Sequence, residues 1–172
     1  MLILGLDPGL RHTGWGLVEA TGNQLRFVAC GAVHTDAATD LASRLGALYG
    51  GLGQVIEGHL PREAAVEETV VNRNPLSSLK LGHARGVVLL VAAHAGLGVH
   101  EYAAKQVKRA VTGTGNAAKE QVAMMVRFLL PGSGDVVADA ADALAVAICH
   151  AHFRTGRAQI AAQLQRDAAS GA

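Results

Sequence analysis

The first 34 residues decide which kind of sheet this chain builds. Residues 2–34 read LILGLDPGLRHTGWGLVEATGNQLRFVACGAVH. A continuous apolar run over residues 2–6 predicts a buried strand, and the Asp-Pro-Gly at 7–9 predicts a tight turn after it. Residues 13–20 and 25–34 predict two further strands, because the Thr-Gly-Asn between them is typical of a hairpin. The chain is therefore expected to open with three antiparallel strands.

Helices and strands alternate through the rest of the sequence. Helices are predicted over residues 41–57, 76–95, 103–111, 117–130 and 139–153, and strands over 63–69 and 98–102. Asn116 is the expected cap of the fourth helix, and the length and small residues of the second suggest a long buried helix. Strand-helix-strand units after an antiparallel meander imply a mixed sheet with helices on both faces, in a three-layer α/β domain.

Length and composition set the class of protein. A chain of 172 residues suits one domain with a real core, and an apolar content of 50% excludes a disordered protein. We expect this domain over residues 1–155, with 156–172 frayed or disordered. Cys30 and Cys149 lack zinc-site spacing and are interpreted as reduced structural thiols. With no signal peptide, and no apolar stretch long enough to span a bilayer, we expect a cytoplasmic protein without membrane contact.

Four carboxylates stand out because their surroundings are apolar. Asp7 ends the first strand, and Glu67 lies at or near the end of a later one. Asp139 and Asp142 are three residues apart on an alanine-rich helix, so they share one face. Buried carboxylates repel one another, and a divalent cation such as Mg²⁺ removes that penalty. Two such ions about 4 Å apart would suit phosphodiester hydrolysis.

Each carboxylate also has a simpler interpretation. Asp139 can be a helix N-cap, and Asp142 can interact with the helix dipole. Asp7 before Pro-Gly can be an Asx-turn residue, and Glu67 beside Glu68 can be a solvated strand end. The spacing alone leaves the metal site and these alternatives open.

A formal net charge of +1 hides a strong segregation of charge. Residues 73–127 hold eight bases against two acids, a net of +6, and the remainder carries −5. A basic face beside an acidic site suits a polyanion held over metal ions. The alternative is that Lys105, Lys108 and Arg109 form a solvated helix face. The Gly-rich turn at 113–116 can bind phosphate through its N–H groups or serve only as a turn.

Four motifs in order resemble the RuvC family of Holliday junction resolvases. They are GLDPGLRHTGWG at 5–16, AVE at 65–67 followed by LKLGHARG at 79–86, EYAAKQVK at 101–108, and ADAADALA at 138–145. The resemblance covers residues 2 to about 153 without a break. It implies a ribonuclease H-like three-layer α/β/α fold with a mixed central sheet.

The resemblance also implies an activity and its machinery. The family works as a homodimer that cuts two strands of a four-way DNA junction symmetrically and leaves 5′-phosphate ends. Its carboxylates bind Mg²⁺, two ions per site, or Mn²⁺, and they correspond to Asp7, Glu67, Asp139 and Asp142. Lys108 and Lys119 match basic positions that touch DNA. RuvA and RuvB are the expected branch-migration partners.

We expect DNA contacts from a wider set of polar residues. The set is Arg11, Arg73, Asn74, Lys80, Arg85, Lys105, Lys108 and Lys119. In the expected mechanism Asp7 bridges two ions, Glu67 and either Asp142 or Asp139 hold one ion each, and Lys119 neutralises the scissile phosphate or orients the water. The helix from Leu76 would form much of the dimer interface.

Some positions depart from the family pattern. Glu68 stands where Gln is frequent, and strand alternation should point it away from the metals. Val70 replaces a frequent aromatic and cannot stack on bases. His83 stands where Gln is common, and His150 and His152 are interpreted as structural because their spacing places them on different helix faces.

Two functions of other classes remain as alternatives. An actin-like or sugar-kinase ATPase also opens with a Gly-x-Asp-x-Gly turn, but it needs about twice this length. A non-catalytic junction-binding protein of the same fold would have lost a carboxylate, and this chain has all four.

Overall fold

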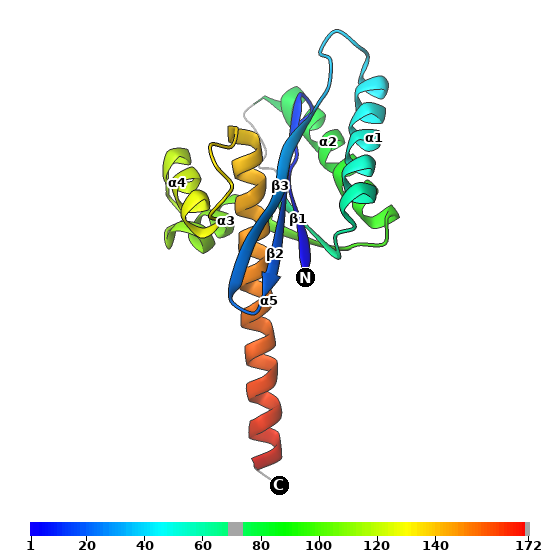
Figure 1. The fold of residues 1–172 in the computed structure, drawn as a ribbon. Coiled ribbons are helices and arrows are strands. Elements are labelled where there is room, and N and C mark those ends of the chain that lie inside the picture. Colours follow the sequence, from blue (N-terminus) through cyan, green and yellow to red (C-terminus); the bar gives the residue numbers. More distant parts are fainter. Residues whose placement is uncertain (69–73, 171–172) are drawn as a thin grey trace.

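A five-stranded mixed sheet organises the molecule (Figure 1). The computed structural model describes residues 1–68 and 74–170, with side chains up to residue 156. The elements are β1 (Leu2–Asp7), β2 (His12–Thr21), β3 (Gln24–His34), α1 (Leu41–His59), β4 (Glu63–Glu68), α2 (Pro75–His94), β5 (Gly98–Ala103), α3 (Ala104–Thr112), α4 (Lys119–Leu129) and α5 (Ala138–Ser170). The sheet order is β3-β2-β1-β4-β5, with β1, β2 and β3 antiparallel and β1, β4 and β5 parallel. The predicted meander and mixed sheet are confirmed.

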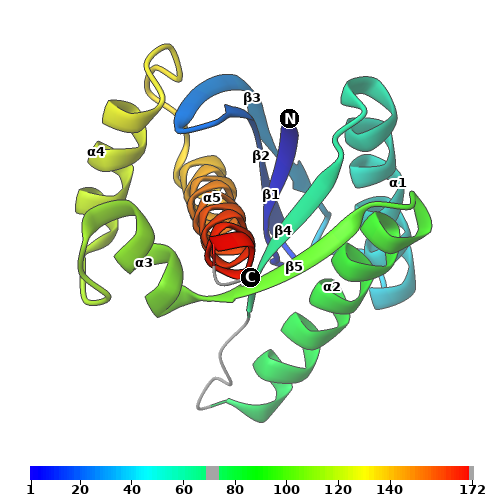
Figure 2. The same ribbon diagram turned by 90° about the horizontal axis from the view of Figure 1, so that it is seen from below.

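Helices cover both faces of the sheet, as Figure 2 shows, with α1 and α2 on one side and α3, α4 and α5 on the other. Strand alternation sends successive side chains into two separate cores. Leu4 and Leu6 of β1 pack in the core under α1 and α2. Ile3 packs with residues of α5 in the other core. The three-layer α/β/α arrangement expected from the sequence is therefore present.

Glycines in β1 and β2 let α5 lie close against the sheet. A Cβ added to Gly5 would lie 2.0 Å from the carbonyl oxygen of Ala143 in α5. A Cβ added to Gly14 would lie 2.0 Å from the carbonyl oxygen of Asp139. Both contacts are with backbone, so no side chain at these positions can be accommodated by a rotamer change. These glycines therefore fix how closely the first turns of α5 approach the end of β1.

Two predicted helix ends differ from the structure. Asn116 does not cap α4, which begins after Ala118, and the Gln121 Oε1 accepts from the Ala118 N–H at 2.9 Å. The last helix does not end near residue 153, because α5 continues to Ser170 and extends past the sheet (Figure 1). Residues 157–170 are mainly Ala, Gln, Arg and Leu, without Pro or Gly, and such residues favour helix. The helix end predicted near residue 153 is therefore wrong, while the domain boundary near 155 and the frayed or disordered tail stay predictions.

Helix α2 is less buried than its composition suggests. Only Ala84, Val88, Val91 and Ala92 are buried among its residues. Leu76, Leu79 and Leu90 are 69%, 59% and 58% exposed. By length and composition α2 is the one described helix that could cross a membrane, a test that core helices of soluble proteins also pass. The expectation of a long buried helix is therefore wrong for the isolated chain.

The two cysteines are unpaired thiols, as expected. Cys30 is half-buried in β3, and Cys149 is buried in α5. Burial raises the pKa of the Cys149 thiol to about 12, with a further contribution from the charge of Glu67. Cys149 is therefore held in its neutral form and acts as a core residue.

Candidate active site

Two carboxylates stand side by side where β1 and β4 end. Leu6 pairs with Val66 in parallel register, so Asp7 and Glu67 follow at the same edge of the sheet. Leu6 and Val66 point into the core under α1 and α2. Alternation therefore directs Asp7 and Glu67 to the opposite face, toward α5. Ligands of α/β sheets collect at this carboxyl edge.

Helix α5 brings a third carboxylate to the same place. A cavity of about 170 Å³ is lined by the acidic side chains of Asp7, Glu67 and Asp142. Lys108 of α3 and Lys119 of α4 also line it, and its apolar wall comes from Ala104, Val107, Val122 and Ala145. This apolar wall was not expected from the sequence, although Ala145 is one turn after Asp142 and each valine is close to a lysine in the chain.

Asp139 lies one turn before Asp142 and does not line the cavity. It is inside the first turn of α5, which begins at Ala138, so the N-cap interpretation is wrong. Its charge nevertheless reaches the site, because it contributes to raising the pKa of Asp7. The structure thus places three of the predicted carboxylates around one cavity and the fourth beside it.

The electrostatics of this cavity oppose negative charge. Burial, followed by the charges of Glu67 and Asp142, raises the pKa of Asp7 from 3.8 to about 7. Burial also raises the pKa of Glu67, again with a contribution from Asp142. Crowded carboxylates with little water resist ionisation unless a cation compensates them. Their oxygen-only donor set is the one that Mg²⁺ and Mn²⁺ prefer, so these residues fit a divalent-cation site.

Two lysines partly offset this acidic charge. The Lys119 Nζ donates to Asp142 Oδ2 at 3.1 Å, and this hydrogen bond raises the pKa of Lys119. The Lys108 Nζ donates to the carbonyl oxygen of Ala117 at 2.8 Å. Lys108 is half-buried, so the solvated-face interpretation is wrong for it, whereas Lys105 and Arg109 are exposed. Both lysines therefore place positive charge beside the carboxylates, Lys108 as a half-buried side chain and Lys119 as one that is 76% exposed.

The other predicted DNA-binding residues that the structure describes lie outside the cavity. Arg11, Lys80 and Lys105 are exposed. Arg85 forms an ion pair with Glu101. Asn74 caps α2, its Oδ1 accepting from the Leu76 N–H at 3.0 Å. Arg73, like Val70, lies outside the described residues.

Three residues that were not assigned to the site from the sequence differ in exposure: Glu68 and His152 are exposed, and His150 is buried. Glu68 is exposed and alternates away from Glu67, as expected. His152 is exposed, with its Nδ1 3.2 Å from the carbonyl oxygen of Ala110. His150 is buried and faces the sheet, where it meets Glu63, a contact that sequence reasoning missed. The two histidines do lie on different faces of α5.

Known proteins resemble this chain over nearly its whole length. A family model described as "Crossover junction endodeoxyribonuclease RuvC" matches residues 3–150. Curated proteins of that name are 60% identical over 161 residues in Rhodospirillum rubrum, covering 94% of this chain and 95% of the relative. In Paramagnetospirillum magneticum the identity is 61% over 166 residues, covering 96% of this chain and 100% of the relative. The solved structure "T. thermophilus RuvC in complex with Holliday junction substrate" has a TM-score of 0.84 at 36% identity, covering 90% of this chain and 95% of that one.

Proposed function

Because the chain belongs to the RuvC family of crossover junction endodeoxyribonucleases, we propose that it resolves four-way DNA junctions by hydrolysing two phosphodiester bonds symmetrically. The supporting observation is the cavity where Asp7, Glu67 and Asp142 converge beside two lysines. A ribonuclease H-like sheet delivers these groups at its carboxyl edge, open to a DNA backbone. The products would carry 5′-phosphate ends.

The four carboxylates would hold two divalent cations, Mg²⁺ or Mn²⁺. When bound, such ions supply a water of lowered pKa and stabilise the leaving oxygen. Asp7, Glu67 and Asp142 would be the ligands, because their carboxylates line one cavity. Asp139 would support them through its charge, which also acts on the pKa of Asp7. The chain's own contribution is to hold these oxygens together at a site where burial removes competing water.

Lys119 and Lys108 would act on the DNA strand that enters the cavity. Lys119 pairs with Asp142 and is otherwise exposed at its tip, so it can exchange that partner for a phosphate oxygen. Lys108 is fixed by Ala117 and would set a positive potential at the wall. Arg11, Asn74, Lys80, Arg85 and Lys105, which lie outside the cavity, are proposed as further DNA contacts, and so is Arg73. We further propose that the enzyme works in the cytoplasm with RuvA and RuvB.

Cleavage of a labelled synthetic four-way junction tests this function. The parent protein should nick two opposing strands at symmetric positions with Mg²⁺ or Mn²⁺, and it should leave ends that a DNA ligase seals. The duplex arms alone, at equal concentration, should stay intact. Absence of cutting with both metals, or equal cutting of duplex, would contradict the proposal.

Replacing Lys119 by methionine should slow junction cleavage by about 100-fold, the scale on which single charge-stabilising groups act. The charge of Lys119 also lowers the pKa of Asp7 and Glu67. Its loss should therefore move the acidic limb of the pH–rate profile to higher pH. Arg109→Met is the control, since Arg109 is exposed, lies outside the cavity and is not among the proposed DNA contacts. Equal cleavage rates and pH profiles for the two variants would remove Lys119 from the mechanism.

Helix α2 supplies the surface for the proposed homodimer. Leu76, Leu79 and Leu90 are spaced for one helix face and are all exposed. Junction cutting at two symmetric positions needs two active sites, which a two-fold dimer provides. Self-association through this stripe would cover the apolar surface that the isolated chain leaves in water.

Leu79→Glu should convert the dimer to a monomer. Burying a leucine contributes about 1.5–3 kcal/mol, and a two-fold interface contains it twice, so the dissociation constant should rise by at least about 100-fold. Sedimentation velocity at micromolar concentration measures this directly. Leu60→Glu is the control, because Leu60 is 75% exposed but lies beyond α1. A parent that sediments only as a monomer would overturn the dimer.

A further inference from the structure

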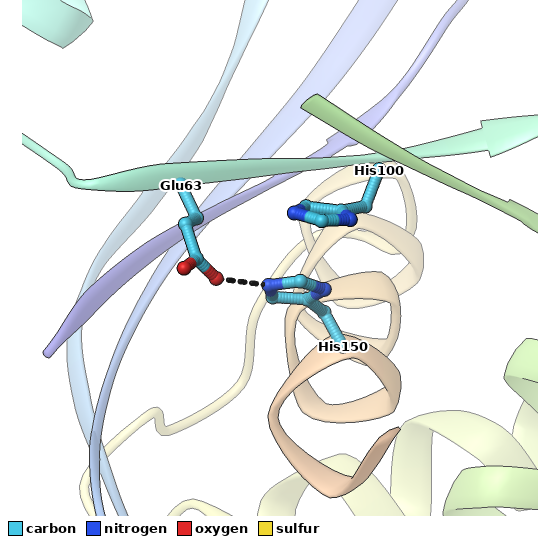
Figure 3. Close-up of side chains that lie close together, drawn as sticks. All are labelled: Glu63, His100 and His150. Carbon is cyan, nitrogen blue, oxygen red and sulfur yellow. Dashed lines mark hydrogen bonds and ion pairs between the residues drawn. The ribbon is translucent and has the colours of Figure 1, made fainter. Parts of the chain in front are cut away.

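A second group of potential metal ligands lies outside the catalytic cavity. Glu63 opens β4, His100 lies in β5 and His150 lies in α5. The three side chains come together between the sheet and the helix (Figure 3). One ligand atom from each lies within 4.8 Å of the others. The parallel register of β4 and β5 creates this cluster, because Glu63 pairs with Gly98 and His100 is two residues further on the same face.

His150 is held with one ring nitrogen toward Glu63. Its Nε2 lies 2.6 Å from Glu63 Oε2, and its Nδ1 lies 2.8 Å from the Tyr102 hydroxyl. The side chain is 2% exposed. A hydrogen bond at Nδ1 that fixes the ring and directs Nε2 to a cation is the usual environment of a metal-bound histidine. His150 is therefore oriented in advance.

His100 completes the donor set. Its ring lies over that of His150, with centroids 4.6 Å apart. Its Nε2 is on the side of Gly98 and Glu63, since a Cβ added to Gly98 would be 3.7 Å from both that atom and Glu63 Cγ. The missing side chain at Gly98 leaves space beside the donors. Both histidines and the carboxylate thus face one point.

We propose that Glu63, His100 and His150 form a second metal site, selective for a transition-metal cation of the Zn²⁺ class. Two imidazole nitrogens and one carboxylate oxygen are the donors of zinc sites that keep one open position. Mg²⁺ prefers oxygen donors, so the ions of the catalytic site are not expected here. A tetrahedral site separates its donors by about 3.3 Å, which requires a small movement of half-buried His100 toward Glu63.

Binding at this site would change the tautomer of His150 without releasing its proton. Without metal, the His150 Nε2–H donates to Glu63, and the Tyr102 hydroxyl donates to Nδ1. With metal, the proton moves to Nδ1 and donates to the Tyr102 oxygen, the Nε2 lone pair binds the cation, and no net proton need leave the imidazole. Arg154 opposes binding, because its Nε lies 3.4 Å from Glu63 Oε1. Its side chain is 51% exposed and can turn into solvent.

A cation at this site would stabilise the fold and would take no part in junction cleavage. Glu63 and Glu67 are four residues apart on β4, about 13 Å. His150 is eight residues from Asp142 on α5, about 12 Å. A cation there would join β4, β5 and α5, the elements that carry Glu67 and Asp142. At a free concentration 100-fold above its dissociation constant, it should raise the ratio of folded to unfolded protein by about 100-fold.

The test uses the full chain with Asp7→Asn and Asp142→Asn, which weaken the catalytic site for cations. Calorimetric titration with Zn²⁺ should give one ion per chain. Co²⁺, its spectroscopic substitute, should give the visible absorption of a four-coordinate, nitrogen-ligated ion. Added to this background, His100→Gln should weaken binding by more than about 100-fold, and Tyr102→Phe by about 10-fold. Arg154→Gln should tighten binding.

His152→Gln is the matched control, because His152 is an exposed histidine two residues away on α5. It should leave Zn²⁺ affinity and the Co²⁺ spectrum unchanged. Metal-free His100→Gln should melt like its parent, which separates lost binding from lost folding. Binding that survives His100→Gln, binding lost in His152→Gln, or no binding below millimolar Zn²⁺ would each overturn the proposal.

Discussion

Asp7→Asn should give a protein that still binds four-way junctions but cuts them at least about 100-fold more slowly than its parent. Asparagine keeps the shape of the side chain and removes a negative charge that would help to hold the cations. Three other acids also raise the pKa of Asp7, so its charge is strongly disfavoured without a cation. Gel-shift and single-turnover cleavage measurements on one labelled junction separate binding from chemistry.

The same substitution should stabilise the metal-free protein at pH 8. The pKa of Asp7 is about 7 in the folded chain against 3.8 as its ordinary value. The folded state therefore keeps this proton to higher pH than the unfolded state, and stability falls as pH rises from about 4 to 7. Removing the charge should restore about 2–4 kcal/mol at pH 8, or about 5–10 °C in Tm. At pH 4 the two proteins should melt alike.

Divalent cations should make the parent more stable than Asp7→Asn at pH 8. Saturating Mg²⁺ should raise the Tm of the parent at pH 8 and change that of Asp7→Asn little, since binding to the folded state alone stabilises it. Cleavage by Asp7→Asn at the same rate as the parent would exclude Asp7 from the mechanism. Equal melting of the two metal-free proteins at pH 8 would show that Asp7 carries no buried charge.

Gly14→Ala is expected to damage the site without touching a carboxylate. The new Cβ would lie 2.0 Å from the carbonyl oxygen of Asp139 and 2.6 Å from its carbon. Backbone must move to accept it, so the first turn of α5 should shift away from β2 and carry Asp139 and Asp142 with it. Overpacking of this kind costs about 1–3 kcal/mol. A displacement of about 1 Å at catalytic groups reduces rates by about 100-fold.

Thermal melting and junction cleavage together test the expected effects of Gly14→Ala on stability and on cleavage rate. The loss of cleavage at 25 °C should persist where the variant is still fully folded. Gly46→Ala is the control, since Gly46 lies within α1 with no atom within 4 Å of the added Cβ. It should gain about 0.5–1 kcal/mol and cut normally. Normal cutting by Gly14→Ala would show that α5 can be displaced without consequence.

The sequence contained enough to predict the sheet but not every helix end. Apolar periodicity and turn residues identify strands such as β1 because those signals are local. The start of α4 depends on the Gln121 side chain reaching back to Ala118, a contact that competes with the stronger capping tendency of Asn116. The exposure of α2 could not be foreseen either, since composition does not say whether a partner or the chain itself covers an apolar face.

In the candidate site too, local sequence signals predicted some residues, while other contacts depend on tertiary structure. Asp7 and Glu67 could be placed together because parallel strands end at one edge, and Asp142 because helix spacing is fixed. The engagement of Lys108 with Ala117, and of Arg85 with Glu101, requires tertiary structure. Helix spacing alone led to the interpretation of His150 as a structural residue. Its partners come from the register of β4 and β5, which joins residues far apart in the chain.

The length of α5 provides an attachment point far from the catalytic cavity. At 33 residues this helix is about 50 Å long, and its last turn is about 40 Å from Asp142. A fluorophore, affinity tag or surface linker attached at the far end would therefore stay clear of the cavity that Asp142 lines. Enzyme attached to a surface in this way would allow single-molecule measurements of junction cleavage, with the cavity left accessible.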